Sequence, residues 1–83
     1  MAHFAKVNNN IVDDVIVVAN SDCGGGDFPE SEPIGQAFIA SLGLTGTWLQ
    51  TSYSGSFRNC YAGPTYSFDA SLGEYGEFLP PVA

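Results

Sequence analysis

Residues 8–18 read NNNIVDDVIVV and carry the strongest structural signal in the chain. Six of the eight residues in 11–18 are Val or Ile, whose branched side chains suit the pleated surface of a strand. Residues 3–7, before the three asparagines, alternate in polarity. Asparagine tolerates the left-handed conformations of a tight reversal, so residues 8–10 are expected to form a turn. The stretch therefore predicts an N-terminal β-hairpin whose second strand is largely buried.

Residues 33–42 form the one segment with helical periodicity. The three- and four-residue spacing places a set of mostly apolar side chains on one expected buried face: Ile34, Ala37, Phe38 and either Ser41 or Leu42. Ser31 or Glu32 can cap the start of the helix, and Pro33 suits its first turn. Gly43 suits its end. We expect a single short helix here.

Strand patterns return in the second half of the chain, over residues 47–53, 65–69 and 74–79. The last two are expected to pair around a turn at residues 70–73, and residues 57–63 read as extended or irregular. The predicted fold class is mainly β (α+β). It consists of an N-terminal β-hairpin, one short helix and then a small antiparallel sheet.

The chain has 83 residues, which fits one small domain spanning 1–83. Its hydrophobic content of 45% is well above that of a disordered chain, so we expect it to fold. Residues 20–33 are rich in Gly and acidic residues and predict a surface loop. Residues 80–83 begin with two prolines and read as a C-terminal tail. A core this small is marginal, and such domains often use a crosslink, a metal or a partner subunit.

Charge is the most lopsided feature of the composition. The chain has nine acidic residues but only two basic residues, Lys6 and Arg58, which gives a net charge of −7. Nucleic acids and anionic membranes are therefore poor partners, because both are bound through clustered basic residues. The acidity either keeps an apolar chain soluble or docks it against a basic surface. No apolar run is long enough to span a membrane, and no secretory signal is recognisable, so we expect synthesis in a cytoplasm.

Residues able to support catalysis or bind a metal are few. His3 is the single histidine and lies near the chain end, so no nucleophile–base–acid arrangement is indicated. Together, His3, Cys23 and Cys60 supply at most three soft ligands, fewer than the four of a structural zinc site. The acidic loop lacks the ligand spacing of a calcium-binding EF-hand. We therefore expect no catalytic residue, no metal and no cofactor. The two cysteines either form a disulfide or remain independent thiols, with Cys60 the more buried.

Arg58 lies among aromatic residues in the sequence, which suits a guanidinium that stacks on rings and donates several hydrogen bonds. The favoured interpretation is a clamp inside the fold, either to Asp69 or to loop carbonyls; the alternative is an interface contact. The aromatic residues exceed what one small core can hold, so some are expected at an interface, or stacked on sugars. The interface candidates are Trp48, Tyr53, Arg58, Tyr61, Tyr66 and Tyr75.

Several blocks of the sequence carry a resemblance. They are the MAHFA start, WLQTSY at 48–53, FR at 57–58, YAG at 61–63 and TYSFD at 65–69. In order and spacing they resemble a family of small virion-associated proteins of tailed phages, especially cyanophages. That family's pattern is an MAHFA-like start, WxQTSY and then FRxxYAGxGYxYD. The chain departs from this pattern at Pro64-Thr65, where Thr65 stands at the position of the second Gly.

The resemblance implies a role in the virion, without catalytic residues to carry over. On this basis we expect a non-enzymatic structural protein made in the host cytoplasm, specifically a capsid decoration (cement) protein. Its partners would be other virion proteins, the major capsid protein or copies of itself, and it would be oligomeric in the assembly. The alternatives are a tail- or fibre-associated module that binds a host glycan or receptor, and an acidic regulator directed at a host protein.

Overall fold

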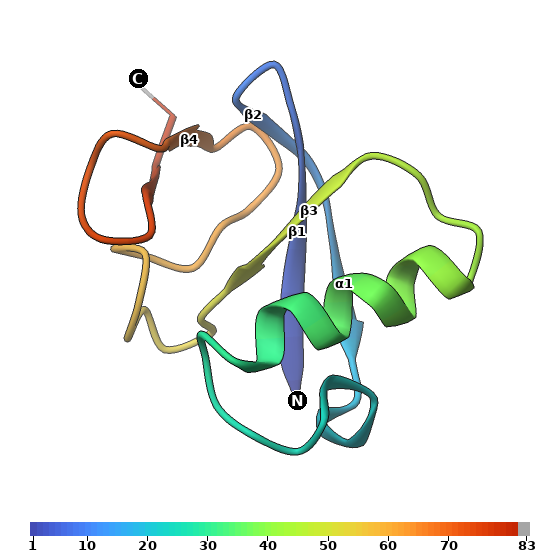
Figure 1. Ribbon diagram of the computed structural model, residues 1–83. Helices are drawn as coiled ribbons and strands as arrows, with labels where there is room; N and C mark the ends of the chain where they lie inside the picture. The colour runs from blue at the N-terminus through green and yellow to red at the C-terminus, as the bar shows by residue number, and fades with distance from the viewer. Residues whose placement is uncertain (82–83) are drawn as a thin grey trace.

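The N-terminal hairpin forms the centre of the fold in a computed structural model, which describes residues 1–81 (Figure 1). Strand β1 (Ala2–Asn8) pairs antiparallel with β2 (Ile11–Val18). Asn9 and Asn10 form the connecting turn with φ angles of 52° and 65°. Both angles lie in the left-handed region that asparagine tolerates. The predicted hairpin and its turn are confirmed.

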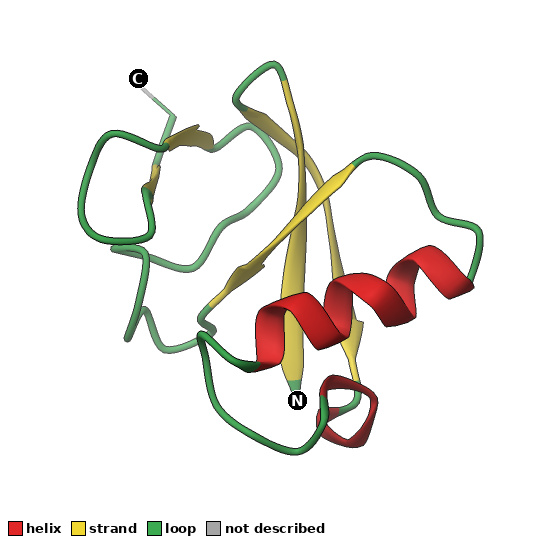
Figure 2. Cartoon of the chain, viewed as in Figure 1, coloured by secondary structure: helices red, strands yellow, loops and turns green. Residues whose placement is uncertain are grey.

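The sheet has five strands in the order β3-β1-β2-β4-β5, and each strand pairs antiparallel with its neighbours (Figure 2). The three later strands are β3 (Thr47–Thr51), β4 (Ser67–Asp69) and β5 (Glu77–Leu79). The predicted mainly β class is confirmed, although these strands are shorter than predicted. The connection between β4 and β5 continues to Gly76, whose φ of 80° is unsuitable for a strand.

Strand β2 is not largely buried, contrary to the prediction. Only Val12 and Val18 are buried in it. The reason is the sheet topology, because β4 pairs with β2 only at Ile11, opposite Ser67. Beyond that point β2 has a neighbouring strand on one side only. A pattern rich in branched residues predicted the strand correctly but did not reveal how much of it the small chain could cover.

The predicted helix is confirmed as α1 (Ser31–Ser41), but its buried face differs from the prediction. Ile34 is exposed, while Gly35 and Ile39 are buried. A Cβ atom on Gly35 would lie 2.3 Å from Cζ of Phe4, so the missing side chain lets the helix approach the sheet closely. Gly43 follows the helix with a φ of 82°, as expected of a terminating glycine.

The start of α1 also differs from the prediction. The N-cap is Glu30, without a capping hydrogen bond from its side chain, whereas Ser31 and Glu32 are already helical. The predicted loop over residues 20–33 thus contains the first residues of α1 and a short 3₁₀ helix, η1 (Asn20–Cys23). The irregular part between the two helical segments is shorter than predicted.

Two groups of buried side chains form the core. One lies between α1 and the sheet and contains Ala2, Phe4, Val18, Cys23, Ile39 and Trp48. The other lies beneath the C-terminal segments and contains Ala5, Val12, Ala62 and Phe78. Central strand β1 contributes to both, because neighbouring side chains on a strand point to opposite faces. Figure 1 shows α1 crossing near the N-terminus while the orange and red C-terminal segments gather near the hairpin turn.

Within residues 1–81, no helix has the length and apolar character required to cross a membrane. The predicted tail at 80–83 falls partly outside this range, since residues 82–83 lie outside the described residues.

Candidate functional site

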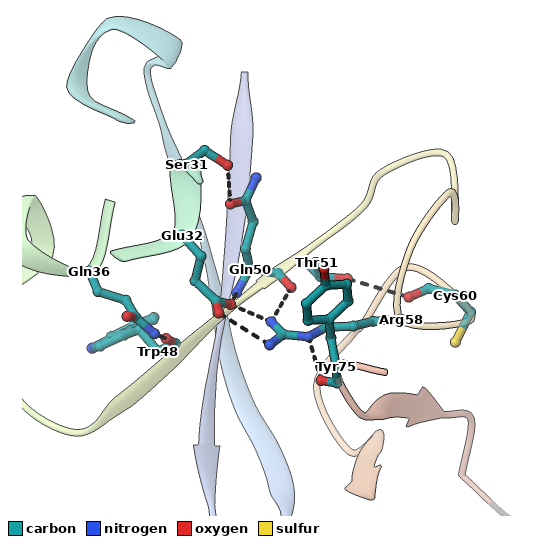
Figure 3. A network of polar contacts seen from close by, with 9 residues as sticks. All are labelled: Ser31, Glu32, Gln36, Trp48, Gln50, Thr51, Arg58, Cys60 and Tyr75. Carbon is teal, nitrogen blue, oxygen red and sulfur yellow. Dashed lines mark hydrogen bonds and ion pairs between the residues drawn. The ribbon is translucent and has the colours of Figure 1, made fainter. Parts of the chain in front are cut away.

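Arg58 is the centre of the main polar network (Figure 3). Its side chain is 6% exposed and forms a bidentate ion pair with Glu32, in which Nη2 donates to Oε1 at 3.2 Å and Nη1 contacts Oε2. Nη1 also donates to the carbonyl oxygen of Gln50 at 2.9 Å, and Nε donates to that of Tyr75 at 3.0 Å. The guanidinium carbon lies 5.0 Å from the ring centroid of Phe28. Arg58 is therefore a clamp within the fold that also bonds a loop carbonyl.

The predicted partner Asp69 does not bind Arg58. Its carboxylate accepts hydrogen bonds from the backbone N–H and the hydroxyl of Ser71, at 2.9 and 2.6 Å. These bonds lower the pKa of Asp69. The carboxylate that pairs with Arg58 comes from the first turn of α1, 26 residues earlier in the chain. The positions of the acidic residues in the sequence do not indicate that Glu32, among all of them, is the partner of Arg58.

Side chains close the outer edge of β3. Antiparallel pairing directs the N–H and C=O of alternate residues away from the neighbouring strand, and on β3 those residues include Trp48 and Gln50. The Gln50 N–H donates to Oε2 of Glu32 at 2.7 Å, and its C=O accepts from Arg58. The Trp48 C=O accepts from Nε2 of Gln36 at 2.6 Å. Because these groups are used, another strand cannot pair here without breaking them.

The edge formed by β5 is closed in the same way. The Phe78 N–H donates to the carbonyl oxygen of Arg58 at 3.0 Å. The Phe78 C=O accepts from Nδ2 of Asn59 at 2.9 Å and from the Cys60 thiol at 3.2 Å. Both ends of the strand order are therefore covered by the chain itself.

The most exposed aromatic side chain in the described chain belongs to Tyr53, which is 75% exposed. Its ring stacks on His3 with centroids 5.4 Å apart, and both rings meet Tyr61 edge-on at 5.3 and 5.5 Å. Val17 lies opposite His3 in the register and is 52% exposed. We call these four residues, His3, Val17, Tyr53 and Tyr61, the tyrosine patch. Its three aromatic rings are in mutual contact.

A second aromatic group lines a hollow of about 470 Å³ on another part of the surface. The rings of Phe28 and Phe57 stack with centroids 3.9 Å apart, and Tyr75 meets Phe28 edge-on at 5.0 Å. Asp27 and Ser56 also line the hollow and supply polar groups. A hollow lined by aromatic side chains with a few polar atoms has the composition of a small-ligand site.

The six interface candidates are distributed unevenly. Tyr53 and Tyr61 meet in the tyrosine patch, while Tyr75 lies at the hollow. Trp48 is buried in the core beside α1, and its indole N–H donates to the carbonyl oxygen of Thr45 at 3.1 Å. Tyr66 is half-buried against the second core group. The sequence did not reveal His3 as a member of an aromatic patch, since nothing in its spacing links it to Tyr53.

Cys23 and Cys60 are free thiols in different core groups, so no disulfide joins them. The expectation that Cys60 is the more buried is wrong: Cys23 is 2% exposed, whereas Cys60 is half-buried. Cys23 faces Gly35, which leaves room for its sulfur against α1. Burial raises the pKa of both thiols; Asp22 adds to the effect at Cys23 and Glu77 at Cys60.

In the described range, no cluster of three or more His, Cys, Asp or Glu residues is arranged to hold a metal ion. Comparisons of the chain with models of protein families, with curated proteins and with solved structures find no significant match.

Proposed function

We propose that the protein is a non-enzymatic structural subunit of a phage virion, specifically a capsid decoration (cement) protein. It would attach to the shell through the tyrosine patch. The observation that carries this proposal is the exposure of Tyr53 together with its fixed stacking on His3. The virion as the assembly comes from the sequence resemblance described above.

The physical support lies in the cost of forming an interface. Aromatic residues are enriched in protein–protein interfaces, where they bury much area with few rotatable bonds. Contacts with His3 and Tyr61 already restrict the Tyr53 ring, so less side-chain entropy is lost on binding. The exposed Val17 enlarges the apolar part of the patch. An interface of about 800 Å² per partner, centred on such a patch, is enough for stable attachment.

The closed edges of β3 and β5 make side-chain packing the natural mode of attachment at those sides of the molecule. At both edges the outward backbone groups of Gln50 and Phe78 already have partners within the chain. A shell subunit that added a strand there would have to displace them. The tyrosine patch requires no such rearrangement.

The direct test is to analyse purified virions by mass spectrometry and cryo-electron microscopy. We expect many copies, in a fixed ratio to the major capsid protein, on the outside of the shell. A few copies at the tail would instead support the tail or fibre module. Absence from particles would reject a virion role and favour the host-directed regulator.

A second experiment tests the patch itself by adding purified variants to particles that lack the protein. Tyr53→Ala should weaken attachment at least about tenfold, as expected for an aromatic anchor. Leu42→Ala is the matched control, because Leu42 is also exposed but lies at the end of α1. Equal attachment of both variants would reject the tyrosine patch as the docking surface.

The glycan-binding alternative rests on the hollow beside Phe28, Phe57 and Tyr75. Rings that line a hollow together with a carboxylate and a hydroxyl suit the apolar and polar faces of a sugar. Screening the isolated protein on a glycan array, with Tyr75→Ala as the comparison, distinguishes this function. Glycan binding that depends on Tyr75 would favour it over the decoration role.

A further inference from the structure

One stretch of the sheet has an outward side that no other strand covers: residues 14–18 of β2, which we call the β2 edge. In the register, β4 pairs with β2 only at Ile11. Backbone hydrogen bonds also join Val12 to residues 65 and 66, and this contact ends before residue 14. Among residues 1–81, no strand pairs with the outward side of residues 14–18. The β2 edge therefore contrasts with the closed edges of β3 and β5.

The register identifies the backbone groups that this edge presents. Since Gln50 points its N–H and C=O away from β1, its partner Phe4 points its own groups toward β2. Phe4 lies opposite Ile16, so Ile16 bonds inward and its neighbours Val15 and Val17 point outward. The outward groups are thus the N–H and C=O of Val15 and Val17.

Within residues 1–81, only one of these four groups has a side-chain partner. The Val15 N–H donates to Oδ1 of Asp14 at 2.9 Å, within an exposed pair of adjacent residues. An incoming carbonyl can replace this local bond, which would release the Asp14 carboxylate for a new partner. Val15 and Ile16 are half-buried and Val17 is exposed, so an added strand would also cover aliphatic surface.

The charge beside the edge indicates which strand fits. Asp13 and Asp14 are both exposed, and the only ion pair in the described chain joins Arg58 to Glu32. Lys6 lies opposite Asp14 in the register without pairing to it. A second copy of the chain would bring its own net charge of −7 and two more aspartates to this edge.

We infer that the β2 edge binds an extended segment of a basic partner protein by strand addition. The segment carries Lys or Arg toward Asp13 and Asp14 and aliphatic side chains beside Val15 and Val17. Main-chain hydrogen bonds supply affinity, and the aspartates select the basic partner and disfavour self-pairing. This inference deepens the proposed function, on which it rests for the partner being another protein of the assembly.

The test uses the isolated protein and a synthetic peptide of about nine residues, long enough to cover the strand. The peptide alternates valine with lysine and threonine. A second peptide has glutamate in place of lysine, and a third keeps the lysines but is N-methylated on the edge that would face β2. Binding is followed by the backbone amide shifts of Val15 and Val17 in NMR spectra.

The basic peptide should bind at least about tenfold more tightly than the other two, and more weakly as salt is raised. Asp13→Lys with Asp14→Lys should reverse the preference between the basic and acidic peptides. The matched control, Glu30→Lys with Glu74→Lys, changes the net charge equally at exposed residues outside β2 and should keep the preference.

Three results would overturn the inference. The first is unchanged Val15 and Val17 amides at saturating basic peptide. The second is equal binding of the N-methylated peptide, which would indicate charge attraction without strand pairing. The third is a dimer, detected by sedimentation, in which these amides shift with protein concentration alone. Tyr53→Ala should leave peptide binding unchanged, so failure of the tyrosine patch and failure of the β2 edge are distinguishable.

Discussion

The carboxylate of Glu32 and the guanidinium of Arg58 bind each other and also bind the two outward backbone groups of Gln50. One ion pair therefore joins the first turn of α1, the edge of β3 and the irregular segment that contains Arg58. The pair is well shielded, with 6% of the Arg58 side chain and 16% of the Glu32 side chain exposed. Its position makes it a structural element of the fold, not a surface ion pair of small effect.

We expect Glu32→Gln to lower the free energy of unfolding by about 3–5 kcal/mol, because it leaves the guanidinium buried without its counter-charge. Urea unfolding followed by circular dichroism measures the change. Glu30→Gln is the control, since Glu30 is exposed and its side chain makes no capping bond; it should change stability by less than about 0.5 kcal/mol. Similar losses in the two variants would contradict the structural role of the pair.

Gly35→Ala should destabilise the protein even though alanine is the better helix former. The added Cβ would lie 2.3 Å from Cζ of Phe4 and 2.9 Å from Sγ of Cys23. Such overpacking costs about 1–3 kcal/mol or more, against a gain in helix propensity of about 1 kcal/mol. Thermal unfolding should therefore show a lower Tm. In a double-mutant cycle, Phe4→Leu should relieve part of the loss, whereas additive effects would show that the two residues do not collide.

The success of the sequence predictions depended on how local their physical causes are. The hairpin was predictable because Asn9 and Asn10 and the alternation around them act within a few residues. The end of α1 at Gly43 was predictable for the same reason. The buried face of α1 was not, because its contact point is Gly35. A residue without a side chain adds nothing to a hydrophobic pattern.

The candidate site shows the same division. The sequence indicated that Arg58 would act as an internal clamp, because a lone guanidinium among aromatic rings favours that role. Its partner could not be predicted, since Glu32 reaches Arg58 only after α1 has docked against β3. The unpaired side of β2 could not be predicted from the sequence either. It results from the shortness of the contact between β2 and β4, which no pattern within β2 reveals.

The two thiols should differ in reactivity. Unreduced protein is expected to show two titratable thiols, and Cys60 should be alkylated before Cys23, which is almost fully buried beneath α1. Both should react slowly near neutral pH, because burial raises their pKa and the thiolate is the reactive form. Mass spectrometry of peptides after brief alkylation measures the order, and in denaturant the difference should disappear. Faster reaction of Cys23 in the folded protein would contradict the packing described.

His3 should make stability depend on pH. Burial against Tyr53 and Tyr61, and secondarily the positive charge of the amino terminus, lower the pKa of His3 below the ordinary value of 6.5. Between these two pKa values the unfolded chain holds more protons than the folded one, so the free energy of unfolding rises with pH. The contribution of His3 is therefore complete above pH 6.5 and is lost as the pH falls through the folded pKa.

NMR titration of the His3 ring protons gives its folded pKa directly, and His3→Gln should remove this part of the pH dependence. The informative quantity is the difference in Tm between the two proteins from about pH 5 to 7.5, because the carboxylates titrate mostly below this range. Acetylating the amino terminus should raise the pKa of His3 partway, since it removes the smaller of the two causes. Titration of His3 at or above 6.5 in the unmodified protein would show that the stacked arrangement with Tyr53 does not desolvate the ring.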